Sequence, residues 1–257
     1  MKIAILGVGA EGNFWQLFIQ KHDLGLVVTS DRAEDNQSVI DQADVVIITV
    51  PMSAVSELVS SCVFQPQQLV ISAVGEWTHS SKALATISAE WILLHRMCGP
   101  VASMVGQNLI LNTENAPKHR TSKWFCDLLT ALGANEVSSD KEEHDVAISI
   151  TQTLLRLITV CFFVVLLHSK VNLERLGLFS SPPFRILKMV MVRILGQGAN
   201  LCFDMLSSHV HARESITAMS SALEIIRGLI DRQDRKGFHE LFQSFEPLVT
   251  KEDRDKA

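Results

Sequence analysis

Three glycines near the N-terminus have the spacing of a phosphate-binding turn. Gly7, Gly9 and Gly12 form the pattern G-x-G-x-x-G. An apolar, β-rich run, Lys2 to Leu6, precedes them, and an amphipathic segment, Asn13 to His22, follows. In such a strand–turn–helix unit, glycine permits a sharp bend, lets a pyrophosphate lie against bare backbone and allows close helix–strand contact. The helix N-terminus then offers unpaired N–H groups to the phosphates, so the pattern predicts a dinucleotide site.

Asp31 stands where an acid that binds the adenosine ribose hydroxyls is expected, after a second apolar run, Leu26 to Val28. A carboxylate repels a 2′-phosphate, so we predict NAD as the cofactor. Arg32 could accept that phosphate, and NADP therefore stays an alternative. The other residues expected to line the cofactor lie in the glycine turn and at a later strand end: Ala10, Glu11, Val50 and Pro51.

His95 is the candidate catalytic residue. It ends an apolar run in LLHRMCGP, which places it at the carboxyl end of a predicted strand, facing the crevice where a nicotinamide would lie. A histidine there can take the proton of a substrate hydroxyl as hydride leaves, because its pKa lies near operating pH. A core histidine satisfied by backbone is the alternative. His144 and Asp145 could form a catalytic pair, but we interpret them as a structural junction, because adjacent residues on a helix do not face each other.

Three arginines lie inside apolar helical sequence: Arg156, Arg185 and Arg193. A buried guanidinium is costly unless a carboxylate accepts its N–H groups. One alternative is internal pairing with Glu142, Glu143, Glu174 or Asp204. Three such arginines beside a dinucleotide site instead favour a small anionic substrate, a dicarboxylate, with Arg193 as the leading ligand.

The elements that must position these residues alternate between strand and helix over the first part of the chain. Ala43 to Pro51 reads ADVVIITVP, the continuous β-branched run of a strand buried on both faces. From Lys141 the periodicity is helical, including one unbroken helix from Leu201 to Ile230, and the last residues, Lys251 to Ala257, are expected to be a frayed tail. We predict an α/β fold: a Rossmann-like, doubly wound parallel sheet over residues 1–140 and an all-helical domain over residues 141–257.

Composition excludes several classes of partner. A net charge of −5 gives no electrostatic footprint for nucleic acid or an anionic membrane. The five cysteines are scattered without C-x-x-C spacing, so we expect reduced thiols, no metal site and a cytoplasmic protein without a signal peptide. The apolar run from Leu157 to Leu167 is shorter than the roughly 20 residues of a spanning helix. It is therefore interpreted as a buried core helix or a subunit interface.

Several separated blocks resemble the prephenate dehydrogenase family. They are the glycine pattern, ADVVIITVP, the H-x-M-x-G-P block from His95 to Pro100, the EHD block from Glu143 to Asp145, Gln152, and LFSSPPFRILKMVMVRIL from Leu178 to Leu195. The resemblance implies a Rossmann domain followed by a helical substrate-binding domain that forms a homodimer. It also implies hydride transfer from ring C4 to the nicotinamide, loss of CO2 and aromatisation. His95 matches the family histidine that binds the 4-hydroxyl, Arg193 matches the arginine that binds the substrate carboxylate, and Arg185 matches a second arginine.

The chain departs from that family pattern around the expected substrate site. Val74-Gly75-Glu76 replaces serine-valine-lysine, so a hydroxyl near C4 is missing at Val74. Arg156 replaces a histidine and Arg96 a proline, while Cys202 and His209 replace an aromatic residue and an asparagine. We therefore carry three hypotheses: a prephenate dehydrogenase, a dehydrogenase for a C4-modified analogue such as 4-amino-4-deoxyprephenate, and a dimeric paralogue that binds the cofactor without catalysis.

Overall fold

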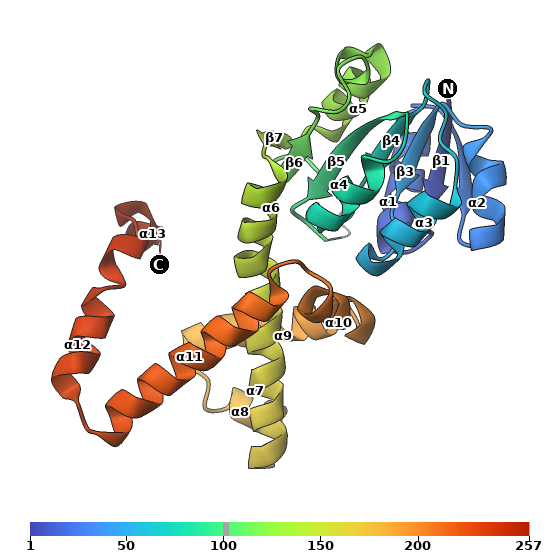
Figure 1. Cartoon of the computed structure of the whole chain (residues 1–257). Coiled ribbons are helices and arrows are strands. Elements are labelled where there is room, and N and C mark those ends of the chain that lie inside the picture. Colours follow the sequence, from blue (N-terminus) through green and yellow to red (C-terminus); the bar gives the residue numbers. More distant parts are fainter. Residues whose placement is uncertain (100–102, 257) are drawn as a thin grey trace. The chain divides into compact units, whose positions relative to one another are not determined.

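The fold is known from a computed structural model of the whole chain, which describes residues 1–99 and 103–256 (Figure 1). Pro100, the last residue of the H-x-M-x-G-P block, lies outside the described residues. The chain forms two compact units, Met1–Ala212 and Arg213–Ala257. The division at residue 140 that the composition suggests stays a prediction.

The first unit is built on a seven-stranded sheet of order β2-β1-β3-β4-β5-β6-β7. The strands are β1 (Lys2–Leu6), β2 (Leu26–Ser30), β3 (Val45–Ile48), β4 (Leu69–Ser72), β5 (Glu90–Arg96), β6 (Asn108–Asn112) and β7 (Asn135–Ser138). All neighbouring pairs are parallel except β5 and β6, where His95 lies opposite Ile110. The predicted doubly wound parallel sheet is therefore confirmed, with one antiparallel pair, β5–β6, among the described strands. In the described chain no helix joins β5 to β6, and a parallel pair would need such a crossover.

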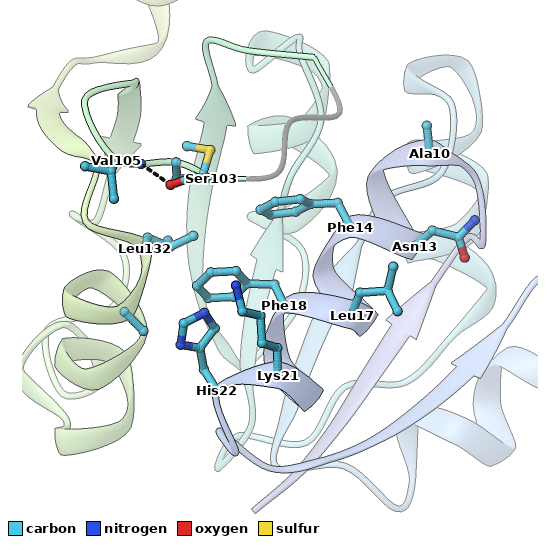
Figure 2. Close-up of a pocket in the computed structure, with 12 residues that line it drawn as sticks. Ala10, Asn13, Phe14, Leu17, Phe18, Lys21, His22, Ser103, Val105 and Leu132 are labelled. Carbon is cyan, nitrogen blue, oxygen red and sulfur yellow. Dashed lines mark hydrogen bonds between the residues drawn. The ribbon is translucent and has the colours of Figure 1, made fainter.

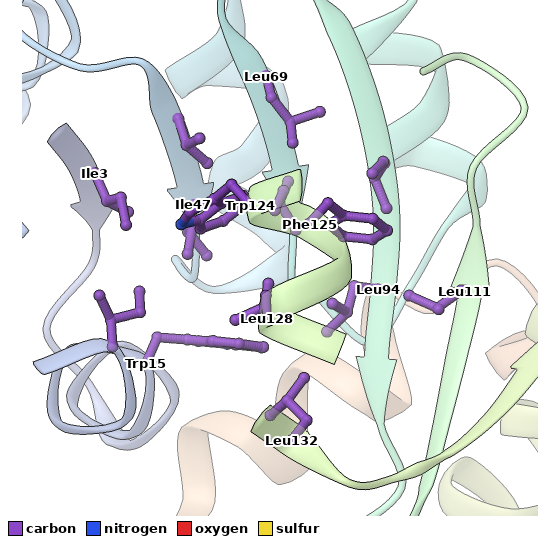
Figure 3. Close-up of a cluster of buried hydrophobic side chains, with 14 of the residues drawn as sticks. Ile3, Trp15, Ile47, Leu69, Leu94, Leu111, Trp124, Phe125, Leu128 and Leu132 are labelled. Atoms are coloured by element: carbon purple, nitrogen blue, oxygen red, sulfur yellow. The ribbon is translucent and has the colours of Figure 1, made fainter. Parts of the chain in front are cut away.

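Helices cover both faces of the sheet. α1 (Ala10–Lys21) and α5 (Lys123–Leu132) pack on one face, while α2 (Ala33–Ile40), α3 (Val55–Ser61) and α4 (Thr78–Leu84) pack on the other. Successive strand residues point to opposite faces, so Ile3 and Ile5 belong to one core cluster and Ala4 and Leu6 to the other. Figure 3 shows the first cluster, in which Trp15 of α1 and Phe125 of α5 lie against the strands.

The rest of the first unit is helical, as predicted. It comprises α6 (Lys141–Ile148), α7 (Leu155–Ser169), α8 (Leu173–Gly177), α9 (Pro182–Leu195) and α10 (Ala199–Ser207). A π-helical stretch, Ser149–Leu154, joins α6 to α7 without a break. Only Arg156 and Thr159 of α7 are buried, while Val164, Val165 and Leu167 are exposed, so the interpretation of its apolar run as a buried core helix is wrong. The alternative interpretation as a subunit interface remains.

The second unit contains α11, which begins at Ala212 and ends at Asp231, then α12 (Arg235–Gln243) and α13 (Lys251–Lys256). Two expectations fail in this part of the chain. The continuous helix predicted from Leu201 to Ile230 is interrupted between Ser207 and Ala212, and the expected frayed tail is instead the short helix α13.

One helix, Lys141–Ser169, is long and apolar enough to cross a membrane when judged by length and composition only. α9 and α10 pass the same test together but are bent by 94° at their junction. One or two such helices are weak evidence, since core helices of soluble proteins meet the same criteria.

Candidate active site

The glycine turn has the geometry of a dinucleotide cradle. Gly7 adopts φ +100°, a conformation that side chains rarely allow. A Cβ on Gly12 would lie 1.9 Å from the carbonyl oxygen of Gly7, so only glycine permits this approach of α1 to β1. A Cβ on Gly9 would meet no atom within 4 Å, which leaves open space above the turn. The residues present therefore fit a pyrophosphate at the N-terminus of α1.

Neighbouring residues shape the rest of this cradle. The Gly7 N–H donates to the carbonyl of Ser30 at 2.7 Å, which brings the exposed Asp31 and Arg32 to the turn. Val50 and Pro51 follow β3, whose end is tied to the turn because the Thr49 hydroxyl donates to the Gly7 carbonyl at 2.8 Å.

The Glu11 carboxylate is engaged inside the protein. It accepts from Arg96 Nε at 2.8 Å and from Trp15 Nε1 at 2.9 Å. The Arg96 guanidinium also lies 3.6 Å from the centre of the Phe14 ring. The Glu11 carboxylate is thus already paired, and Arg96 links α1 to the strand that carries His95.

A chain of hydrogen bonds runs from His95 into the protein. His95 Nδ1 lies 2.9 Å from His144 Nε2, and His144 Nδ1 lies 2.8 Å from Asp145 Oδ1. A carboxylate only accepts hydrogen bonds, so His144 Nδ1 carries a proton and donates it to Asp145. His144 Nε2 therefore accepts the N–H of His95 Nδ1. His95 Nε2 then carries no proton and is left bare, free to accept one. The expectation that His144 and Asp145 do not face each other is therefore wrong. Their side chains are in contact and hold the candidate base.

Asp145 is fully buried and tightly held. It accepts backbone N–H groups of Trp77 at 3.0 Å and Thr78 at 2.8 Å, at the start of α4. Burial alone would raise the pKa of Asp145, but these bonds and the one from His144 hold it below its usual value. The Trp77 indole also stacks on the His144 ring, with centres 3.7 Å apart. The bonding thus fixes both the tautomer and the orientation of His144.

Burial, together with the nearby His144 and Arg96, lowers the pKa of His95 to about 3. The ring is therefore neutral at neutral pH and can accept a hydrogen bond at Nε2.

Arg156 is a buried cation without an acidic partner. Its side chain is on α7 and the residue is 6% exposed. Nη1 donates to the Gln152 carbonyl at 3.1 Å and Nη2 to the Gln197 amide oxygen at 2.8 Å, while Nε has no partner among the described residues. None of the carboxylates proposed as internal partners pairs with it in the described part of the chain. Burial lowers the pKa of Arg156, and an anion at Nε would relieve that cost.

Arg193 on α9 reaches the segment that follows His95. Its Nη2 atom lies 2.8 Å from the point where a Cβ on Gly99 would stand, so the absence of a side chain at Gly99 makes room for the guanidinium. Arg185, on the same helix, is exposed. Neither arginine forms an ion pair with a carboxylate that the structure describes.

His209 is a further buried polar group. It is 3% exposed, its Nδ1 accepts the N–H of His211 at 3.3 Å, and its Nε2 has no partner among the described residues. Burial lowers its pKa to about 4.

A separate hollow of about 630 Å³ lies between α1 and α5 (Figure 2). Phe14, Leu17 and Phe18 form one wall, and Val105 and Leu132 form another. His95 and the buried Arg156 are not among its lining residues, so this hollow lacks the groups of the candidate reaction. Within residues 1–99 and 103–256, no cluster of His, Cys, Asp and Glu could hold a metal ion.

Comparison with known proteins identifies the helical part. Residues 140–244 match the family described as prephenate dehydrogenase, dimerization domain. This part of the chain thus resembles the dimerization domain of that family. A probable arogenate/prephenate dehydrogenase of Methanocaldococcus jannaschii is 22% identical over 84% of this chain and 49% of its own length. A T-protein of Enterobacter agglomerans is 22% identical over 93% of this chain and 65% of its own length. The chain thus spans one half to two thirds of the length of these curated relatives.

Solved structures share the fold of this chain at low identity. The prephenate dehydrogenase of A. aeolicus in complex with hydroxyphenyl propionate and NAD+ has a TM-score of 0.72, 15% identity and 96% coverage of both chains. The arogenate dehydrogenase of Synechocystis has a TM-score of 0.65 and 17% identity, with coverage of 100% of this chain and 99% of its own. These likenesses support the sheet-plus-helices architecture.

The structure also changes which residue faces the base. The family resemblance placed a missing hydroxyl at Val74, but Val74 is 5% exposed and packs in a core cluster. The position that faces His95 is Gly75, where a Cβ would lie 3.4 Å from Nε2. Sequence reasoning therefore did not connect three residues with the candidate base: Gly75, His144 and Asp145. The EHD block was visible as a motif, but its contact with the end of β5 was not.

Proposed function

We propose that this chain is an NAD-dependent dehydrogenase that oxidatively decarboxylates prephenate to 4-hydroxyphenylpyruvate. The observation that carries the proposal is the bare Nε2 of His95, held by His144 and Asp145 at the carboxyl end of β5. The intact relay argues against the hypothesis of a paralogue without catalysis. The family match and the glycine cradle support the class of reaction.

We propose NAD as the cofactor, bound by the glycine turn with its ribose at Asp31. When bound, NAD+ supplies a hydride acceptor at C4 of its nicotinamide ring. The exposed Arg32 keeps NADP as the alternative, because a guanidinium beside the ribose can bind a 2′-phosphate.

In this proposal His95 takes up one proton from the substrate and later returns it. As the hydride leaves C4 of the substrate, the 4-hydroxyl becomes strongly acidic, so even a weak base can take its proton at Nε2. The bond from C1 to its carboxylate then breaks, CO2 leaves and the electron pair makes the ring aromatic. His95 returns the proton to the phenolate oxygen, so no net proton is consumed. Asp145 stabilises the charge that passes through His144.

The two carboxylates of the substrate need cationic partners. We propose Arg193 as the ligand of one and Arg156 as the ligand of the other, because Arg156 is buried with a free Nε. Arg185 is a further candidate, and both it and Arg193 are exposed in the single chain.

We propose that the helical region forms a homodimer. Exposed apolar side chains on α9, including Ile186, Met189 and Val192, would be covered by a second copy, as would those on α7. The dimerization-domain match of residues 140–244 supports this assembly. Reduced thiols fit a cytoplasmic location, and all five cysteines are unpaired.

The test is a cofactor-reduction screen with prephenate, arogenate and 4-amino-4-deoxyprephenate, each with NAD+ and NADP+. Reduction by one of these compounds, lost in His95→Asn, supports the proposal. NAD+ binding without reduction by any of them would instead favour the paralogue without catalysis.

A further inference from the structure

Arg96 joins the strand that carries His95 to the first turn of α1. It is the last residue of β5 and is buried. Its Nε donates to Glu11 Oε1 at 2.8 Å, and its Nη2 donates to Glu11 Oε2. The guanidinium therefore holds both oxygens of one carboxylate, a bidentate geometry that gives direction as well as charge.

The other contacts of Arg96 leave Glu11 as the group that balances its charge. The guanidinium carbon lies 3.6 Å from the centre of the Phe14 ring. Nη1 lies 3.6 Å from Met104 Sδ and 3.7 Å from Cys98 Sγ. These soft groups can pack against a cation but carry no opposite charge. Among the described residues, Glu11 is the carboxylate that forms an ion pair with Arg96.

Glu11 would oppose cofactor binding if it had no cationic partner. It lies in the first turn of α1, the turn whose backbone N–H groups are available to a pyrophosphate. One helical turn rises by about 5.4 Å, whereas charges are screened over about 10 Å at 0.1 M salt. A carboxylate in this turn therefore lies within electrostatic reach of the phosphates and, when unpaired, repels them.

We propose that Arg96 is a positioning residue for the dinucleotide: it neutralises Glu11 and ties the first turn of α1 to β5, so that the helix offers a pyrophosphate its N–H groups without a free anion beside them. The inference rests on the proposed cofactor site. Arg96 acts through Glu11 and so couples the glycine turn to the strand end at His95.

Binding of NAD+ is the readout, because turnover would mix two effects. The Arg96 charge, after burial and His144, also contributes to lowering the pKa of His95. A change in kcat could therefore come from the base, whereas a change in the dissociation constant of NAD+ reports on the cofactor site.

The experiment is a double-mutant cycle on NAD+ affinity, measured by calorimetric titration of the whole chain as wild type, Arg96→Met, Glu11→Gln and the double variant. We expect Arg96→Met to raise the dissociation constant about tenfold, because Glu11 loses its cation. Glu11→Gln should lower it about threefold, because a free guanidinium is left near the phosphates, and should also lower the melting temperature. The double variant should bind NAD+ within about threefold of wild type, because neither charge remains.

The matched control is the same cycle at Arg227 and Glu224, an exposed pair on α11. Arg227→Met changes the net charge of the chain by the same amount, and we expect NAD+ affinity within about twofold of wild type.

Salt separates an electrostatic role of Arg96 from a purely structural one. Raising the salt concentration from about 0.05 M to about 0.5 M should shrink the ratio of the Arg96→Met and wild-type dissociation constants, because repulsion by Glu11 is screened. A distorted cradle would keep the same ratio. Melting temperatures establish that each variant is folded.

The outcomes distinguish this inference from the proposed function. If Arg96→Met binds NAD+ as tightly as wild type, or if the double variant binds as weakly as Arg96→Met at every salt concentration, the role of Arg96 is refuted while the cofactor proposal stands. If Arg96→Met does not fold, Glu11→Gln carries the test, and an affinity no higher than that of wild type refutes the role. If wild type binds neither NAD+ nor NADP+, the cofactor proposal fails and the inference falls with it.

Discussion

Replacing Asp145 with asparagine tests the relay most directly. The carboxylate accepts three hydrogen bonds, from His144 Nδ1 and from the N–H groups of Trp77 and Thr78. If the new amide nitrogen takes the Oδ2 position, it opposes the Thr78 N–H, donor against donor. If it takes the Oδ1 position, it opposes the Trp77 N–H and donates to His144, which moves the His144 proton to Nε2. That change reverses the bond to His95 and leaves a proton on its Nε2, where the base must be bare.

The expected cost has two parts. Loss of a buried hydrogen bond to a charged acceptor costs about 1.5–3 kcal/mol of unfolding free energy. Loss of a correctly oriented base lowers kcat by about 10²–10⁴-fold. The assays are steady-state formation of reduced nicotinamide, denaturant unfolding, and nitrogen NMR of the imidazole rings to identify the tautomers.

Asp140→Asn is the matched control for this change. Asp140 caps the same helix by accepting the Glu143 N–H at 2.9 Å, and asparagine caps about as well as aspartate. We expect this control to retain activity and stability. A folded Asp145→Asn protein whose kcat stays within about threefold of wild type would refute the assignment of the relay.

Three further outcomes are expected. Gly9→Ala should keep the wild-type melting temperature, because its Cβ meets nothing within 4 Å, yet raise the NAD+ dissociation constant about tenfold or more in calorimetric titration, because the methyl group occupies the pyrophosphate space; unchanged affinity would contradict the cradle. Arg156→Met should raise KM for the dicarboxylate about tenfold or more while leaving the melting temperature equal or higher, because it removes a buried cation without an acidic partner. The exposed Arg227→Met is its control, and a destabilised Arg156→Met protein with normal KM would show a structural role instead. His95 and His209 have folded-state pKa values of about 3 and about 4, below their ordinary 6.5, so the unfolded chain binds more protons in acid. The free energy of unfolding should therefore be constant above about pH 6.5 and fall as the pH drops towards 4, and the fall should be shallower in His209→Asn. Denaturant unfolding across this pH range measures it, and a constant free energy of unfolding would exclude both pKa shifts.

Local patterns predicted the glycine turn, the sheet and the helical second half, because each depends on neighbouring residues. Gly7 and Gly12 could be recognised from spacing, and the strand that ends at His95 from its apolar run. The β6 strand was recognised as a strand, but its direction depends on a connection that carries no helix. The rule that adjacent residues on a helix do not face each other also gave a wrong expectation for His144 and Asp145, because it describes the surface of an isolated helix.

The relay could not be predicted because its partners are distant in sequence. His95 and His144 are separated by 49 residues, and Asp145 meets the Trp77 and Thr78 amides across 68 and 67 residues. Arg156 Nε likewise has no hydrogen-bond partner among the described residues because the acidic side chains lie elsewhere in the fold, and the sequence does not show their positions. Gly75 looked like an ordinary loop glycine, and only its distance to His95 gives it a chemical meaning.

The π-helical stretch between α6 and α7 has a consequence for how this protein can evolve. His144 lies before it and Arg156 after it, on one continuous helix. Each residue of an α-helix advances the rotation by about 100°. A π-turn holds about one residue more than an α-turn within the same rotation, so deleting a single residue from Ser149–Leu154 would restore regular winding while leaving Arg156 at nearly the same rotation relative to His144. A one-residue deletion should therefore be tolerated better in this stretch than in the regular turns of α6 or α7, where it would turn one residue about 100° relative to the other.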